Sequence, residues 1–174
     1  MREMIRYGLT LAIICIVASG LLAGVNVLTK HRITAQAQAE EDSSLKEVLP
    51  AAESFLPVKS GEEIIYYKAL DKEKNLLGVA FRASGKGYSS SIETMVGMLK
   101  DGTIKAIKVL SQNETPGLGA RVAESSFTGR FSDKKAQDLS AVEAITGATI
   151  SSRAVIDSVK KKAQEIKARV DSGE

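Results

Sequence analysis

Residues 91–110 read "SIETMVGMLKDGTIKAIKVL", with Asp101-Gly102 between two segments that alternate apolar and polar side chains. An Asp-Gly pair in that setting is typical of a two-residue β-hairpin loop. A second hairpin is predicted just before it, where "EIIYYKAL" (63–70) and "LLGVAFRA" (76–83) flank the polar turn "DKEKN". The central part of the chain therefore predicts an antiparallel sheet built from hairpins.

Helices are expected after this sheet. Residues 152–170 predict a long last helix, and residues 123–131, "AESSFTGRF", a short one. Apolar residues of the last helix recur every three or four positions and give one apolar stripe: Val155, Val159, Ala163, Ile166 and Val170. Hairpins with helices packed against them predict an α+β domain.

The N-terminal segment has a different character. Residues 7–29, "YGLTLAIICIVASGLLAGVNVLT", carry no charge, and a helix of that length spans roughly 34 Å, enough for a hydrocarbon core of about 30 Å. We predict a single transmembrane helix as anchor, within residues 1–32. The alternative is a cleavable signal peptide, which has a shorter apolar core; Ala35-Gln36-Ala37 imitates a cleavage site but lies well beyond the apolar run.

Lysine and arginine are nearly balanced on the two sides of the anchor, so the positive-inside rule decides little. The short N-terminal tail favours a cytoplasmic N-terminus, with the remainder of the chain outside the cytoplasm. Residues 33–57 are expected to form a helical stalk or linker, because residues 33–49 are polar and have high helix propensity. Residues 58–174 are expected to form the globular domain.

Composition excludes several function classes. The 174 residues carry a formal charge of only +3, which does not favour nucleic acid as a partner. The single cysteine, Cys15, and the single histidine, His31, lie in or beside the apolar segment. Intramolecular disulfides, metal sites rich in His or Cys and His-dependent catalytic triads are therefore not expected.

A loop with the sequence "ETPGLG" occupies residues 114–119. Pro116 stiffens its entry, while Gly117 and Gly119 permit backbone conformations or close approaches that a Cβ would block. The backbone amides of such a loop can face an anion or the polar edge of a planar ring. A plain surface turn is the alternative, since the motif matches neither a P-loop nor a Rossmann fingerprint.

A second motif, "ITGATISS", occupies residues 145–152 at the start of the last helix. Ser151 or Ser152 is expected to cap that helix, and Gly147 and Ala148 leave little bulk in front of it. The unpaired amides of a helix start favour a phosphate. The motif thus suits a phosphate held beside the hydroxyl of Thr149 or bonded to it, although a loop with a capping serine is an alternative.

Taken together, an N-terminal anchor, a stalk, "GKGYSS" (85–90), "ETPGLG" and "ITGATISS" resemble the FMN-binding domain of the G subunit of the Rnf electron-transport complex. The C subunit of the sodium-translocating NADH:quinone oxidoreductase is a relative. In that family the last threonine of an S/T-G-A-T motif carries FMN through a phosphoester. The resemblance therefore implies covalent attachment at Thr149, with Thr146, Gly147 and Ala148 completing the motif.

The resemblance also implies which other residues contact the flavin: Glu114, Thr115, Gly117, Leu118 and Gly119. Three positions before the first hydroxyl of the attachment motif the family usually has Asp, and this chain has Glu143. The flavin supplies the redox chemistry. We therefore expect no catalytic residue and no metal ligand in the chain itself.

By resemblance the chain is a membrane-anchored electron-transfer subunit with covalent FMN, part of an ion-translocating ferredoxin:NAD+ oxidoreductase. Its partners would be the other subunits of that complex and a flavin transferase. Its domain would lie on the outer, periplasmic side of the cell (inner) membrane. The short connection between anchor and domain favours the G subunit over its relative. The alternatives are the C-type subunit, a cofactor-free extracytoplasmic sensor or adaptor, and a tethered hydrolase using Thr149 or a serine.

Overall fold

The computed structural model describes residues 2–61 and 63–172, without the side chain of His31. Residues 1, 62, 173 and 174, which belong to the expected anchor and domain, lie outside the described part. The chain divides into two compact units, Met1–Glu41 and Asp42–Glu174. Helix α1 (Arg2–Val48) runs through the first unit and ends in the second.

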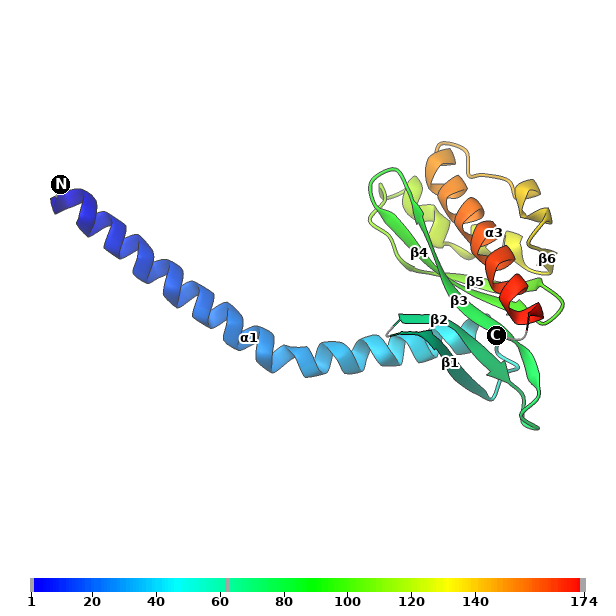
Figure 1. Cartoon of the computed structure of the whole chain (residues 1–174). Coiled ribbons are helices and arrows are strands. Elements are labelled where there is room, and N and C mark those ends of the chain that lie inside the picture. Colours follow the sequence, from blue (N-terminus) through cyan, green and yellow to red (C-terminus); the bar gives the residue numbers. More distant parts are fainter. Residues whose placement is uncertain (1, 62, 173–174) are drawn as a thin grey trace. The chain divides into compact units, whose positions relative to one another are not determined.

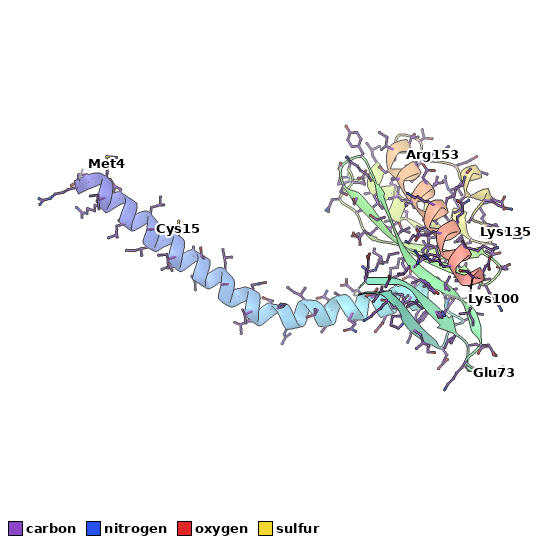
Figure 2. All side chains as sticks on the ribbon, viewed as in Figure 1. Met4, Cys15, Glu73, Lys100, Lys135 and Arg153 are labelled. Atoms are coloured by element: carbon purple, nitrogen blue, oxygen red, sulfur yellow. The ribbon has the colours of Figure 1, made fainter. Side chains whose placement is uncertain are left out.

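The apolar part of α1, Arg2–Lys30, is the one helix of the described chain that is long and apolar enough to cross a membrane. Its described side chains are exposed, and those of Met4 and Cys15 project from the helix (Figure 2). An apolar helix whose side chains enter no protein core fits a membrane-anchored protein.

The last two turns of α1 belong to the second unit. Leu45, Val48 and Leu49 are at most 2% exposed and pack in a cluster on one face of the sheet. Beneath them on strand β4 (Ser91–Leu99), Gly97 lets the carbonyl of Val48 approach so closely that a Cβ would not fit. The end of the expected stalk is thus part of the domain core.

The helix ends at Val48, and strand β1 (Ser54–Ser60) follows, partly within the residues expected to form the stalk. This strand contains Pro57, which breaks most strands because it has no backbone N–H. Proline is tolerated here because β1 is an edge strand of the sheet.

One antiparallel sheet follows the chain in the order β1-β2-β3-β4-β5-β6 (Figure 1). After β1, its strands are β2 (Glu63–Leu70), β3 (Leu76–Lys86), β4 (Ser91–Leu99), β5 (Thr103–Ser111) and β6 (Lys134–Lys135). Both predicted hairpins are confirmed. At the Asp-Gly turn, Gly102 has a φ of +88°. The side chain of Asp101 accepts hydrogen bonds from the N–H (3.0 Å) and hydroxyl (2.9 Å) of Thr103.

Helix α3 (Thr149–Asp171) crosses the other face of the sheet, over β3 and β4 (Figure 1). The predicted stripe is confirmed: Val155, Val159, Ala163 and Ile166 are fully buried, and Val170 is partly buried against the same core. Fully burying one such Val or Ile stabilises the fold by about 1.5–3 kcal/mol. Short helices close the remaining core: η1 (Gly119–Ala123), α2 (Ser125–Thr128), η2 (Gly129–Phe131) and η3 (Asp138–Ala141).

Candidate functional site

A cavity of about 440 Å³ lies where three loops of the second unit meet, within the size range of ligand sites. Its lining comes from the β3–β4 turn, from the "ETPGLG" loop and from the start of α3: Tyr88, Glu114, Thr115, Leu118, Gly119, Gly147, Ala148, Thr149, Ile150 and Ser151. The structure thus brings together most of the predicted site residues. Gly117 and Thr146 belong to the same two loops but do not line the cavity.

Glu114 is at the centre of this arrangement, although it is only 6% exposed. Its carboxylate accepts hydrogen bonds from three successive amides of the β3–β4 turn, those of Tyr88 (3.1 Å), Ser89 (3.0 Å) and Ser90 (3.0 Å). It also accepts one from the hydroxyl of Ser151, at 2.5 Å. One buried side chain therefore fastens all three loops to one another.

The charge of Glu114 is favoured at this position. Burial raises the pKa of the carboxyl, but the hydrogen bonds from Ser151 and from the amides of Ser90, Ser89 and Tyr88 outweigh it, so that the pKa is lowered from its ordinary value. A carboxylate that accepts several hydrogen bonds is stabilised in its ionised form. The ionised carboxylate of Glu114 therefore holds the three loops, and its hydrogen bonds are stronger than those between neutral groups.

Two glycines make room for this carboxylate. A Cβ on Gly119 would lie 2.7 Å from Oγ of Ser151 and 2.8 Å from Cβ of Glu114, and a Cβ on Gly87 would lie 2.6 Å from Oε1 of Glu114. Gly117 and Gly147 serve the backbone instead, with φ angles of +75° and +83°. Glycine is therefore needed at position 119 for space, and at positions 117 and 147 for a positive φ angle.

Helix α3 begins at Thr149, earlier than predicted, and the N-cap residue is Ala148, which makes no side-chain cap. The expectation that Ser151 or Ser152 caps the helix is wrong, because both lie inside its first turn and are buried. The hydroxyl of Ser152 donates to the carbonyl of Ala148 and accepts from the N–H of Ile145. Ser152 therefore holds the loop before α3 against the helix start, while Ser151 bonds to Glu114.

Thr149 is consequently the first residue of a 23-residue helix, and it lines the cavity. Ala148 before it is buried, whereas Ile150 after it is exposed, so the helix starts at the edge of the protein core. The first turn of a helix offers unpaired amides and about half a positive charge. The position suits a negatively charged group on or beside the Thr149 hydroxyl. Arg153, one turn on, is exposed.

The cavity rim is apolar. Tyr88, Leu118 and Ile150 line it and are 72%, 49% and 56% exposed. They are three of the five large apolar side chains that are exposed in the described part of the second unit. Apolar side chains gathered at a cavity mark a binding surface. The sequence patterns do not assign Tyr88 and Ile150 to the site; for Tyr88 the one signal is its place in the glycine-rich bend "GKGYSS".

The described residues contain no group of His, Cys, Asp and Glu that could hold a metal ion. The site has instead a polar end at Thr149 and the start of α3, and an apolar rim. That combination suits a ligand with a phosphate and a flat, largely apolar ring.

Comparison with known proteins identifies the family. Residues 87–164 match the FMN-binding domain family, and residues 1–48 match the RnfG N-terminal region. The first match covers the whole cavity lining. The second covers all of α1.

Two relatives are similar over nearly their whole length. The G subunit of an ion-translocating oxidoreductase complex from Methanosarcina acetivorans is 31% identical, and the match covers 97% of both chains. The G subunit of a proton-translocating ferredoxin:NAD(+) oxidoreductase complex from Clostridium ljungdahlii is 32% identical, and the match covers 90% of this chain and 88% of the relative.

Among solved structures, the C subunit of the Na(+)-translocating NADH-quinone reductase from Parabacteroides distasonis shares the fold, with a TM-score of 0.57. The identity is 16%, and the match covers 78% of this chain and 95% of that one. The chain has an anchor and an FMN-binding domain, and its similarity to the two G subunits extends over nearly its whole length. It therefore belongs to the family of G subunits of ion-translocating oxidoreductase (Rnf) complexes.

Proposed function

We propose that this chain is the electron-transfer subunit of an ion-translocating ferredoxin:NAD+ oxidoreductase complex and carries FMN bonded through its phosphate to Thr149. The observation that carries the proposal is the cavity in which Thr149 at the start of α3, the "ETPGLG" loop and an apolar rim meet. The names of the relatives support membership in such a complex.

The residues of the cavity fit FMN. Leu118, Ile150 and Tyr88 would pack on the isoalloxazine ring, and the backbone of residues 115–119 would face its polar edge. Thr149 and the first amides of α3 would hold the phosphate. When bound, the flavin supplies one- and two-electron redox chemistry; the chain orients the ring and shields part of it from water. No independent catalysis by the side chains is proposed.

Attachment needs a nucleophile and a leaving group. In the proposed reaction the Thr149 oxygen attacks the FMN-side phosphorus of FAD, AMP leaves, and the hydroxyl proton is lost. A separate flavin transferase with a divalent metal would perform this step. The first turn of α3 then keeps the phosphoester's negative charge at the positive end of the helix.

We further propose that the N-terminus lies in the cytoplasm, that α1 crosses the membrane, and that the FMN domain faces outward. On that side a dissociated FMN would be diluted and hard to replace. A covalent tether prevents that loss and fixes the distance from the ring to the next redox centre. Retention of the flavin and a fixed ring position are therefore the physical reasons for a covalent bond, whereas many flavoproteins hold their flavin by noncovalent contacts.

The test compares Thr149 with a threonine outside the motif. Thr149→Val and Thr128→Val chains are each produced with the flavin transferase, denatured, separated on a gel and examined for flavin fluorescence. Thr149→Val should lose the fluorescent band, and Thr128→Val should keep it, because Thr128 lies on α2 and does not line the cavity. A fluorescent Thr149→Val band would refute the assignment.

A further inference from the structure

The segment that carries the attachment motif has an irregular backbone. Residues 143–148 lie between η3 and α3 and consist of a turn flanked by irregular chain. Because such a segment has no helical or strand ladder of its own, its conformation depends on the hydrogen bonds that it makes to the rest of the domain. We call residues 143–149 the attachment segment.

The C-terminal part of the attachment segment is held from inside the domain. The N–H of Ile145 donates to the hydroxyl of Ser152 at 3.0 Å, and the N–H of Ala148 donates to the carbonyl of Ile145 at 2.9 Å. Ile145 and Ala148 are each 6% exposed, whereas Thr146 and Thr149 are exposed. The segment is therefore anchored at two buried residues, and its outer side is open to another protein.

Arg130 holds the N-terminal end of the segment. Its Nη1 donates to the carbonyl of Glu143 at 2.8 Å, and its Nε donates to the carbonyl of Ser126 at 3.0 Å. The guanidinium carbon lies 5.8 Å from the ring centroid of Phe127, which is fully buried and contacts Phe131 edge to face. A planar guanidinium that packs on an aromatic ring and donates in two fixed directions is a stiff link. One side chain thus joins the attachment segment to α2.

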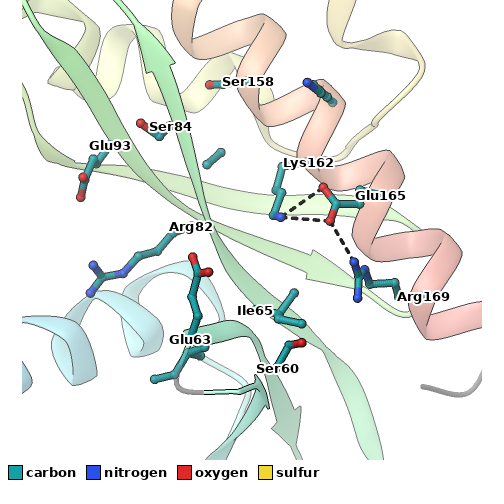
Figure 3. Close-up of a pocket in the computed structure, with 13 residues that line it drawn as sticks. Ser60, Glu63, Ile65, Arg82, Ser84, Glu93, Ser158, Lys162, Glu165 and Arg169 are labelled. Carbon is teal, nitrogen blue, oxygen red and sulfur yellow. Dashed lines mark hydrogen bonds and ion pairs between the residues drawn. The ribbon is translucent and has the colours of Figure 1, made fainter.

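Other arginines of the second unit make a different kind of contact. In the groove that Figure 3 shows, Arg169 lies 3.5 Å from a carboxylate oxygen of Glu165. Arg121 lies 3.7 Å from a carboxylate oxygen of Glu124. Such ion pairs between surface side chains contribute little to stability. Arg130 instead donates to two main-chain carbonyls, so its hydrogen bonds fix the path of the backbone.

We propose that Arg130 is a positioning residue for flavin attachment, because it fixes the start of the segment that presents Thr149 to the transferase. The inference rests on the proposed attachment of FMN to Thr149, and it adds a residue that lies outside both the motif and the cavity lining. In the attachment step the Thr149 oxygen bonds to the FMN-side phosphorus of FAD, the phosphoanhydride bond breaks, AMP leaves and the hydroxyl proton is lost. Arg130 acts on this step through the backbone of Glu143.

Order in the segment should affect recognition of the chain more than the chemical step. When only a fraction of an acceptor has the competent conformation, its apparent affinity falls by that fraction. Loss of Arg130 should therefore raise the KM of the transferase for this chain and leave kcat unchanged, because the bound segment carries the same hydroxyl. A general loss of stability does not predict this result, since a chain that stays folded presents the same segment.

Hydrogen exchange of the unmodified full-length chain in detergent tests the structural part. In Arg130→Ala the amides of Ile145 and Ala148 should exchange faster by about threefold or more, because the segment opens more often. Exchange at Val159, in the buried stripe of α3, should not change. Arg169→Ala is the matched control, since Arg169 is half-buried like Arg130, and it should leave both amides at wild-type rates. Equal exchange at Ile145 and Ala148 in Arg130→Ala and the wild type would overturn the proposal.

Attachment kinetics test the functional part. The purified chain is mixed with the flavin transferase, FAD and a divalent metal, and the gain in mass is followed at several chain concentrations. The KM for Arg130→Ala should be about threefold to tenfold higher than for the wild type, with kcat within about twofold. Arg169→Ala should match the wild type.

Arg130→Lys keeps the test decisive if the alanine variant does not fold. Lysine retains the charge but cannot donate in two fixed directions, so its KM should also rise. A wild-type KM for Arg130→Lys and for a folded Arg130→Ala would overturn the proposal, and so would a fall in kcat with no change in KM. Failure of the attachment site itself looks different, because the flavin mass in the wild-type chain would then map to a residue other than Thr149.

Discussion

Replacing Glu114 by glutamine is the sharpest perturbation of the site, because it keeps the size of the side chain and removes the charge. The wild-type carboxylate accepts four hydrogen bonds, from the amides of Tyr88, Ser89 and Ser90 and from the hydroxyl of Ser151. The single carbonyl oxygen of glutamine can accept two of them. The NH₂ group would then face the remaining donors.

The size of the effect follows from those lost bonds. A buried donor left without an acceptor costs about 1–3 kcal/mol, so two donors cost roughly 2–6 kcal/mol in free energy of unfolding. For a loss of about 3 kcal/mol, a domain of this size should show a Tm lower by on the order of 10 °C. The Glu114→Gln chain should also take up less flavin, because the β3–β4 turn and the start of α3 lose their common partner.

The measurement is urea unfolding of the full-length chain, before and after flavin loading. Glu124→Gln is the matched control, since Glu124 is exposed and lies 3.7 Å from Arg121 in a surface ion pair. Such pairs contribute about 0–1 kcal/mol. If the unfolding free energy of Glu114→Gln lay within about 0.5 kcal/mol of the Glu124→Gln control, a difference typical of surface substitutions, the account of Glu114 as the fastener of three loops would be wrong.

Three further outcomes are expected. Gly119→Ala should destabilise by about 1–3 kcal/mol through overpacking, whereas Gly129→Ala, with open space and a φ of −63°, should be neutral or slightly stabilising in the same urea assay. Because folding lowers the pKa of Glu114, its carboxylate should stabilise the fold fully above the unfolded-state pKa, and this stabilisation should be lost as pH falls through the lower folded-state pKa. The free energy of unfolding, measured against pH, should therefore fall less steeply in acid for Glu114→Gln than for the wild type. Equal slopes for the two chains would contradict this. Leu45→Ala should cost about 2–5 kcal/mol in domain stability and Leu28→Ala, 81% exposed, almost nothing; equal effects would exclude a core role for the end of α1.

The hairpins and the last helix could be predicted from the sequence because their signals are local. Asp101-Gly102 encodes its own turn, and the stripe of α3 is visible in the spacing of apolar residues. Strand β1 could not be predicted in this way. It contains Pro57, and its place depends on being at the edge of a sheet, which only the folded chain reveals.

The candidate site, too, could be predicted from the sequence only where its signals are local. The two motifs are recognisable as short patterns, and the structure brings them to one cavity. The role of Glu114 is not recognisable in the sequence, because its partners lie between 24 and 37 residues away. The wrong prediction of Ser151 or Ser152 as the helix cap has a related cause: in a sequence, a serine that caps a helix cannot be told from one buried in its first turn.

The attachment of FMN to Thr149 is tested most directly by peptide mass mapping of the full chain after production with its flavin transferase. The account predicts one peptide, containing Thr149, heavier by FMN less one water, with fragmentation that places the added mass on that threonine. A fully processed, functional chain in which this peptide is unmodified, or in which the flavin mass maps to another residue, would contradict it.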